Sequence, residues 1–262
     1  MEPVIQGEET ESILETLQLA GRLIMENGGE TYRVEETVCR MGHAFGLENV
    51  ESFAVPSGLF ISCKTRMGEV KTGIQRVYRG GTNLERVDEV NRISRRVEHE
   101  GMTWQEAQKE LAAIQRMKQR SWLFHMIASG ICAAGFAVMF GGRLVDAFVA
   151  CAVSFLVEGM SGVLGRFHMR SFAAVLAGSF ASTLIPMTLQ YFTGVLLTDA
   201  VIAGALMPLL PGLSMTNAVQ DTMRGDIVSG VSHFSQAVLT ASLIAVGALC
   251  GTYLIRMVTG GV

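Results

Sequence analysis

Charged residues are scarce in the second half of this 262-residue chain. Residues 121–262 hold five Lys or Arg and five Asp or Glu, whereas residues 1–120 hold 16 and 19. About a quarter of the residues in soluble proteins are charged, so this scarcity argues against a water-exposed surface around residues 121–262. A net charge of -3 also gives no general attraction to nucleic acid. The sequence therefore predicts water around the first part and lipid around the second.

Motifs for metal binding, disulfides and catalysis are missing as well. The five cysteines contain no C-x-x-C pair, and the histidines show no metal-ligand spacing. Gly58–Thr65 resembles a phosphate-binding loop, but Cys63 replaces its second glycine and the apolar residues indicate a strand. We therefore expect no metal, no cofactor and no enzyme activity. The histidines are interpreted as surface, interface or packing residues: His43, His99, His125, His168 and His233.

Apolar runs of the length that crosses about 30 Å of hydrocarbon recur from Trp122 onward. They carry no charged outer face, which disfavours a soluble helical bundle. The sequence therefore predicts an α+β cytoplasmic domain at residues 1–120, followed by an all-α membrane domain of about five transmembrane helices at residues 121–262. The expected spans lie near 122–140, 144–164, 172–193, 195–213 and 228–257.

Basic residues near the ends of these spans predict the orientation. Arg143 and Arg256 fall on one side, and six Lys or Arg fall on the other: Arg116, Lys118, Arg120, Arg166, Arg170 and Arg224. The N-terminal domain is therefore expected in the cytoplasm and the C-terminus outside. The acidic start at residues 1–11 has no basic or apolar signal-peptide region, which agrees with this expectation.

The first 120 residues alternate between helical and strand-like patterns. Apolar spacing predicts helices and strands. The strand residues that can face a core are Phe53, Val55, Leu59, Ile61, Val70, Ile74 and Val77. Asn83 or Thr82 can cap one helix, and Thr103 with Glu106 forms a capping box for the next. The expected helices are 9–27, 30–46, 83–99 and 103–118, and the expected strands are 50–55, 58–66 and 70–79.

Small residues recur at four-residue spacing within the membrane spans. Gly247 and Gly251 form one such pair, and Gly178 and Ser182 form another. Residues without bulky side chains let helix backbones approach closely in lipid. The motif predicts helix packing, either within one chain or between subunits.

One intramembrane carboxylate, Glu158, stands out in the second span. An ionised carboxylate at the bilayer centre costs roughly 2.5 to 3.5 kcal/mol or more, so Glu158 is expected to serve a function there. Ser154, Ser161 and Gly162 share its helical face. This narrow polar face is a candidate substrate pathway or proton-coupling path; hydration near the cytoplasmic end or a hydrogen bond to another helix is the alternative.

The fourth span contains Pro208 and Pro211-Gly212, and proline disrupts a helix interior. We therefore expect a broken helix, with Ser214 or Thr216 capping a new helix whose N-terminus attracts a substrate carboxylate.

Asn217, Asp221 and Arg224 follow on this new helix as candidate substrate contacts. An Asp221 to Arg224 pair within the helix is the alternative. Asp226 can belong to the pathway or cap the fifth span.

Four segments resemble the bacterial threonine/serine exporter family. The similarity lies in short ordered motifs that are spread over most of the chain: Gly28–Glu35 (GGETYRVE), Pro56–Ser62 (PSGLFIS), Arg76–Arg95 (RVYRGGTNLERVDEVNRISR) and Pro211–Gly230 (PGLSMTNAVQDTMRGDIVSG).

The resemblance implies secondary export of a small polar metabolite, either threonine or serine or a dicarboxylate such as succinate. The full-length exporters carry about ten spans, whereas this chain has about half as many. That difference implies a split, oligomeric system in the inner membrane, with a second small membrane subunit. Glu30, Arg33 and Asn83 match the family's cytoplasmic segments; Arg33 can contact a carboxylate, and Glu30 can cap a helix or pair with Arg33.

Two other functions stay open at this point. The chain could be a membrane-anchored hydrolase whose active site lies in residues 1–120. It could also be a non-transporting assembly or sensory subunit.

Overall fold

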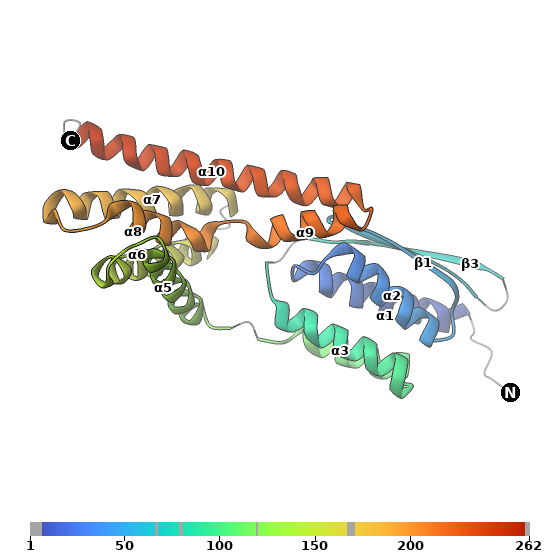
Figure 1. Ribbon diagram of the computed structural model, residues 1–262. Helices are drawn as coiled ribbons and strands as arrows, with labels where there is room; N and C mark the ends of the chain where they lie inside the picture. Colours follow the sequence, from blue (N-terminus) through green and yellow to red (C-terminus); the bar gives the residue numbers. More distant parts are fainter. Residues whose placement is uncertain (1–6, 66–67, 79–80, 119, 167–170, 260–262) are drawn as a thin grey trace. The chain divides into compact units, whose positions relative to one another are not determined.

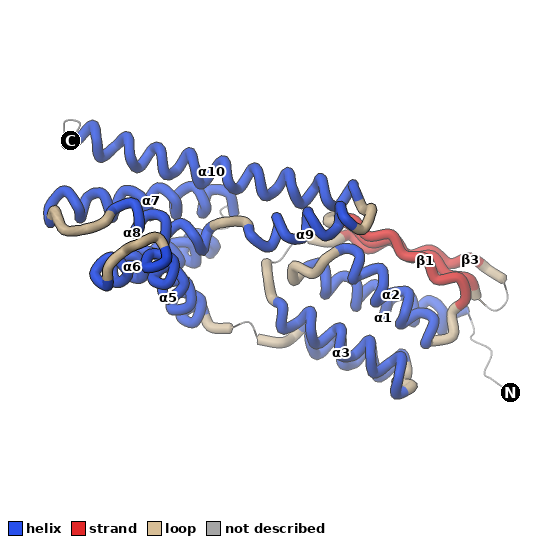
Figure 2. Tube along the Cα trace, in the orientation of Figure 1, coloured by secondary structure: helices blue, strands red, loops and turns tan. Residues whose placement is uncertain are grey.

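The computed structural model describes residues 7–65, 68–78, 81–118, 120–166 and 171–259, with the side chains of residues 7–8, 164–166 and 171 left undescribed. The described residues form two compact units. The sheet unit comprises the chain up to Lys118 together with Leu213–Phe234, and the bundle unit comprises Gln119–Gly212 together with Ser235–Val262. Figure 2 shows one small sheet among helices. The predicted domain boundary lies at residue 120. The two units differ from that prediction in one segment, because residues 213–234 belong to the sheet unit.

Helices and strands of the sheet unit follow the expected order. They are α1 (Gly7–Glu26), α2 (Thr31–Ala44), β1 (Glu48–Val55), β2 (Gly58–Lys64), β3 (Val70–Arg76), α3 (Leu84–Glu100) and α4 (Trp104–Gln115). To these the unit adds most of α9 (Gly212–Met223) and the start of α10 (Ile227–Thr259). Gly28, with a φ of +88°, lets the chain turn between α1 and α2.

The sheet is antiparallel in the order β1-β2-β3, and α1 and α2 pack on one of its faces. Leu59, Ile61 and Val77 are buried, as expected. The expectation that Phe53, Val70 and Ile74 face the core is wrong, because they are 53%, 60% and 68% exposed. Successive residues of a strand point to opposite faces, and the register places Phe53 opposite Phe60 and Phe60 opposite Ile74 on the uncovered face.

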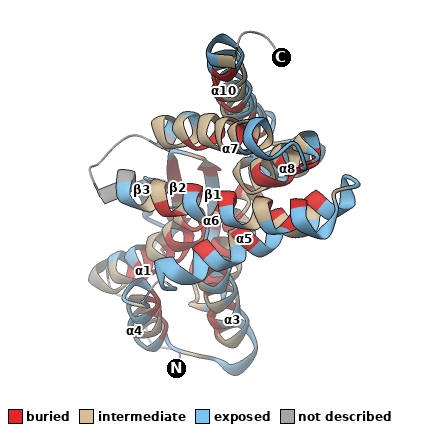
Figure 3. Ribbon diagram, turned by 90° about the vertical axis from the view of Figure 1, so that its left-hand side faces the viewer, coloured by how far each residue is buried: buried red, intermediate tan, exposed pale blue. Residues whose placement is uncertain are grey.

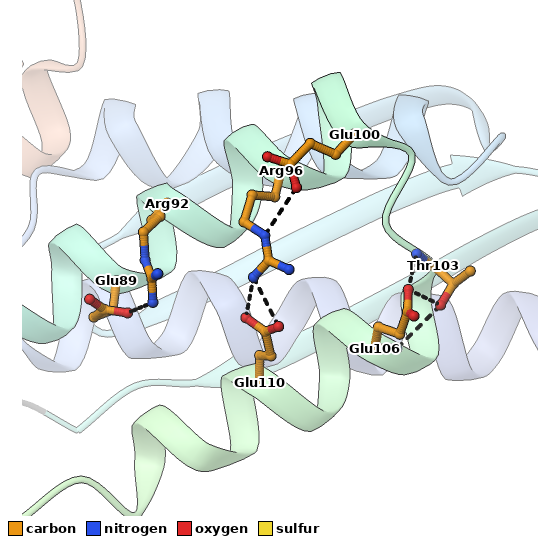
Figure 4. A network of polar contacts seen from close by, with 7 residues as sticks. All are labelled: Glu89, Arg92, Arg96, Glu100, Thr103, Glu106 and Glu110. Carbon is orange, nitrogen blue, oxygen red and sulfur yellow. Dashed lines mark hydrogen bonds and ion pairs between the residues drawn. The ribbon is translucent and has the colours of Figure 1, made fainter.

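Capping residues fix the ends of α3 and α4 as expected. The Asn83 side chain accepts a hydrogen bond from the Arg86 backbone N–H, and Thr103 forms the capping box with Glu106. Figure 4 shows this box beside a surface network in which Arg96 of α3 binds Glu110 of α4 at 2.7 Å. The network joins the two helices on the outside of the unit.

The bundle unit contains α5 (Trp122–Met139), α6 (Leu144–Arg166), α7 (Ser171–Thr193), α8 (Thr198–Leu206) and most of α10. The long helices α5, α6, α7 and α10 are each apolar enough to cross a membrane. Exposed residues cover much of α5 in Figure 3, and many are apolar, including Ile131 and Leu123. Lipid is the solvent that suits such a surface. Arg170, which contributed to the predicted orientation, lies outside the described residues.

Close packing of α10 on α7 confirms the predicted role of the small residues in helix contacts, here within one chain. A methyl group added at Gly247 would lie 2.6 Å from the Leu176 carbonyl oxygen. One added at Gly251 would lie 2.9 Å from the Phe180 carbonyl oxygen. Only glycine lets the backbones of the two helices approach this closely.

The predicted break near Pro208 and Pro211 is confirmed. After α8 the chain forms a short 3-10 turn at Met207–Leu209, and α9 then begins at Gly212, with a bend of 57° between the helices. The expected cap at Ser214 or Thr216 is wrong, because both residues lie inside α9. Pro211 stands directly before the helix, where its fixed φ suits the first turn and its missing N–H costs nothing.

Candidate functional site

Helix α9 and the start of α10 form a hairpin that contacts the α1–α2 turn, α2 and β1 within the sheet unit, and Figure 1 shows the hairpin beside α2. Gly225, with a φ of +91°, makes the turn of the hairpin. We call this contact the polar junction. Its residues are Asn217, Asp221, Arg224, Asp226, Ser229 and His233 of the hairpin, and Gly28, Thr31, Tyr32, Glu35 and Ala54 of the segments that face it.

Three hydrogen bonds join the hairpin to the N-terminal segments. The Asn217 side-chain amide donates to the Gly28 carbonyl oxygen at 3.3 Å. The Thr31 hydroxyl donates to the Asp226 carboxylate at 3.2 Å. The Ser229 hydroxyl donates to the Ala54 carbonyl oxygen at 3.4 Å. Asn217 and Asp226, which the sequence placed in a candidate substrate pathway, are thus hydrogen-bonded to the α1–α2 turn and to α2.

Asp226 also caps α10, as the sequence suggested. Its second carboxylate oxygen accepts a hydrogen bond from the Ser229 backbone N–H at 3.0 Å. One aspartate therefore begins α10 and at the same time holds that helix against Thr31 of α2.

Asp221 and His233 form a buried pair inside the hairpin. One oxygen of the Asp221 carboxylate lies 2.8 Å from Nδ1 of His233, and the two residues are 0% and 3% exposed. The alternative prediction, an ion pair between Asp221 and Arg224, is wrong within the described residues. The Asp221 carboxylate binds His233, and the Arg224 guanidinium lies on the ring of Tyr32. His233 is therefore a partner of an ionisable side chain as well as a packing residue.

Arg224 lies on the face of Tyr32, with its guanidinium carbon 3.5 Å from the ring centroid. An arginine over an aromatic ring gains about 0.5 to 2 kcal/mol from the ring's electron-rich face. Beside this contact α2, α3 and Arg224 enclose a pocket of about 380 Å³. We call it the arginine pocket, and it is lined by Tyr32, Arg33, Glu36, Arg40, Asp88, Asn91, Arg95 and Arg224.

Four arginines and two carboxylates, those of Glu36 and Asp88, line the arginine pocket. Arg33 pairs with Glu30 at 2.9 Å, and Arg40 lies 3.6 Å from Glu98. Arginine binds carboxylates through two parallel hydrogen bonds, so a pocket of this size with Arg95 and Arg224 in its lining suits a small carboxylate.

Glu35 is the third carboxylate of the polar junction. It accepts a hydrogen bond from the Ala54 backbone N–H at 2.8 Å. Burial raises the pKa of Glu35 above its ordinary value, and the negative charges of Asp226 and Asp221 raise it further. The junction therefore holds three carboxylates near one arginine.

We expect Glu35→Gln to stabilise the protein at neutral pH. Because the folded pKa of Glu35 is raised, its contribution to stability is present below the unfolded pKa and is lost as pH rises through the folded pKa. Glutamine keeps an acceptor for Ala54 without the charge. The melting temperature in detergent should exceed that of the wild type at pH 8, and the difference should vanish near about pH 4.

A suitable control for this comparison is Glu48→Gln, because Glu48 is exposed on β1. It should leave the pH profile of stability unchanged. A Glu35→Gln protein that melts below the wild type at pH 8 would show that the charge of Glu35 is required in the junction.

The other expected site residues fall in several places. Glu30 pairs with Arg33, and its side chain does not cap α2. Asn83 caps α3. In the bundle unit Ser154 is buried and lies 2.8 Å from the Ser129 hydroxyl, while Glu158 and Ser161 are half-buried on the same helix. Gly162 faces the indole of Trp122.

Among the described residues no cluster of three His, Cys, Asp or Glu side chains could hold a metal ion. Sequence reasoning missed Tyr32, Glu35 and the partnership of His233. Asp221 and His233 lie on either side of the Gly225 turn. A prediction of an antiparallel helix hairpin at this turn would therefore have placed the two side chains in contact.

Residues 15–255 match the sequence family described as "Putative threonine/serine exporter". The "Probable succinate transporter subunit YjjP" of Escherichia coli (strain K12) is 25% identical over 244 residues, which cover 93% of this chain and 94% of that protein. The "Probable threonine/serine exporter" of Mycobacterium tuberculosis is 23% identical over 240 residues, which cover 89% of this chain but 44% of that protein.

The "Threonine/serine exporter" of Corynebacterium glutamicum is 24% identical over 180 residues, or 66% of this chain and 36% of that protein. No solved structure matches the chain. All three relatives are named as transporters or exporters, and none of the names denotes an enzyme. Because the matched family covers nearly the whole sequence, this chain belongs to the threonine/serine exporter family.

Proposed function

We propose that this chain is one subunit of a secondary exporter that moves a small carboxylate-bearing metabolite out of the bacterial cytoplasm, driven by an ion gradient. The substrate would be threonine, serine or a dicarboxylate such as succinate. A second small membrane subunit would complete the pathway. Relative lengths support this division, because the chain covers 94% of a relative named as a transporter subunit and 44% of a relative named as an exporter.

The arginine pocket carries this proposal. Arg95 and Arg224 bring guanidinium groups to its lining beside Asn91, in a space of about 380 Å³. Amino acids and dicarboxylates share a carboxylate group, and Arg224 lines this pocket directly after the end of helix α9. A substrate carboxylate held by Arg224 would thus lie at the helix that follows the broken span.

The membrane path would use the remaining polar groups of the spans. Glu158, Ser154, Ser161 and Gly162 would line it on α6, and the break at Pro211-Gly212 would expose the start of α9, near Ser214 and Thr216. The N-terminal domain would lie in the cytoplasm and the C-terminus outside the inner membrane. Five spans result when the bent pair of helices counts as one.

We expect Arg224→Ala to weaken substrate binding by about tenfold or more, because a hydrogen bond to a charged group contributes about 1.5 to 3 kcal/mol. The assay is counterflow of labelled succinate, serine and threonine in vesicles that contain this chain and its partner subunit. The half-saturating concentration should rise for the substrate that the wild type carries.

Arg92→Ala is the matched control, since Arg92 is exposed on α3 outside the arginine pocket. It should leave counterflow unchanged. Equal kinetics of the wild type and Arg224→Ala would remove Arg224 from substrate binding. Wild-type vesicles without any counterflow would instead favour an assembly or sensory subunit.

A further inference from the structure

The Asp221–His233 pair lies among polar atoms that lack a donor. Within the described residues the second oxygen of the Asp221 carboxylate has no hydrogen-bond partner, and neither does the amide oxygen of Asn217, four residues earlier on α9. Both residues are buried, at 0% and 1% exposure. A buried acceptor without a donor costs about 1 to 3 kcal/mol. The pair therefore lies in an environment that favours an added positive charge or proton.

Charges around the pair also favour proton uptake. Asp221 comes from α9, Arg224 and Asp226 from the turn after it, and Glu35 from α2, while the Ile227–Phe234 segment of α10 holds His233 as its only ionisable side chain. The pair and its surroundings thus hold more carboxylates than arginines, counting three carboxylates and one arginine. That arginine, Arg224, is exposed and lies on the ring of Tyr32. The raised pKa of Glu35, caused first by burial and then by Asp226 and Asp221, agrees with an excess of negative charge.

Histidine is the side chain whose ordinary titration lies between about pH 5 and 8. A neutral imidazole would bind one proton, and the Asp221 carboxylate at 2.8 Å would stabilise the imidazolium. Release of the proton would restore the neutral ring. The step transfers a proton and breaks no other covalent bond, so the pair can bind and release a proton repeatedly.

We propose that the Asp221–His233 pair is the coupling-proton site of this exporter. The inference rests on the proposed export function and assigns its driving ion to a proton bound inside the α9–α10 hairpin. The hydrogen bonds of Asn217 to Gly28 and of Ser229 to Ala54 flank the pair. Proton binding would therefore change the charge of the surface that holds the hairpin against the α1–α2 turn and β1.

The test compares two measurements on the same vesicles, which contain this chain and its partner subunit. Counterflow at equal pH on both sides reports substrate exchange. Efflux of preloaded labelled substrate with an acidic outside reports coupling to protons. In the wild type the imposed pH step should speed efflux several-fold.

His233→Asn should retain counterflow. The rate of efflux with the pH step, divided by the rate without it, should fall to about one. Asparagine places an amide N–H near the position of Nδ1 and does not titrate. Asp221→Asn should keep the stimulation but shift its half-maximal pH lower, because the imidazolium loses its anionic partner. His43→Asn, at an exposed position on α2, is the matched control and should behave as the wild type.

Each other outcome decides against the pair. Full stimulation in His233→Asn, or its loss in Glu158→Gln alone, would overturn the proposal and in the second case assign the proton to Glu158. Efflux that follows a sodium gradient and ignores pH would also overturn it. Loss of counterflow in both His233→Asn and Asp221→Asn would make the pair structural. Absent counterflow in the wild type would instead refute the export function itself.

Discussion

Gly247→Leu should abolish the folded bundle unit, and Gly247→Ala should destabilise it by about 3 kcal/mol or more. Even a methyl group at Gly247 would lie 2.6 Å from the Leu176 carbonyl oxygen and 3.1 Å from the Phe180 backbone nitrogen. Backbone atoms of α7 cannot move aside as a flexible side chain can. The two helices would have to separate, and they would lose the contacts that hold α10 to α7.

The measurement is the melting temperature and the monodisperse fraction of the purified chain in detergent. Gly135→Ala is the matched control, because a methyl group on this α5 glycine would meet no atom within 4 Å. Alanine there should be neutral or stabilise α5 by up to about 1 kcal/mol. An unchanged melting temperature in Gly247→Ala would mean that α10 does not pack on α7 as described.

Local signals in the sequence predicted most elements of the fold. Apolar periodicity located α1 to α4 and the three strands, and capping residues such as Asn83 and Thr103 fixed helix starts. Proline chemistry predicted the break before α9. Periodicity, capping and proline act over a few neighbouring residues, so their effects can be predicted from the local sequence. The outward direction of Phe53 was missed because both faces of the sheet carry apolar residues.

The polar junction depends on contacts that no local pattern contains. Thr31 and Asp226 are 195 residues apart, and Gly28 and Asn217 are 189 apart. Reading Asp221 along its own helix suggested Arg224 as a partner, whereas the hairpin turn brings His233 to it. The candidate residues of α9 were thus found by their chemistry, and their partners required the fold.

Asp226→Ala should lower the free energy of unfolding by about 2 to 3 kcal/mol. Loss of a helix cap costs about 0.5 to 2 kcal/mol, and Asp226 caps α10 through the Ser229 backbone N–H. The same change removes the acceptor of the buried Thr31 hydroxyl, which costs about 1 to 3 kcal/mol when left unpaired. Melting in detergent should fall by about 4 to 10 °C.

Asp226→Ser separates the two contributions, because serine is a good cap but is too short to reach Thr31. Asp226→Ser should lower the free energy of unfolding by about half as much as Asp226→Ala does. Adding Thr31→Val to Asp226→Ser should then cost little, because the hydroxyl has already lost its acceptor, whereas Thr31→Val alone should be destabilising. Strict additivity of the two changes would contradict the contact between Thr31 and Asp226. Coupling between them would show that Thr31 of α2 holds the start of α10 in place.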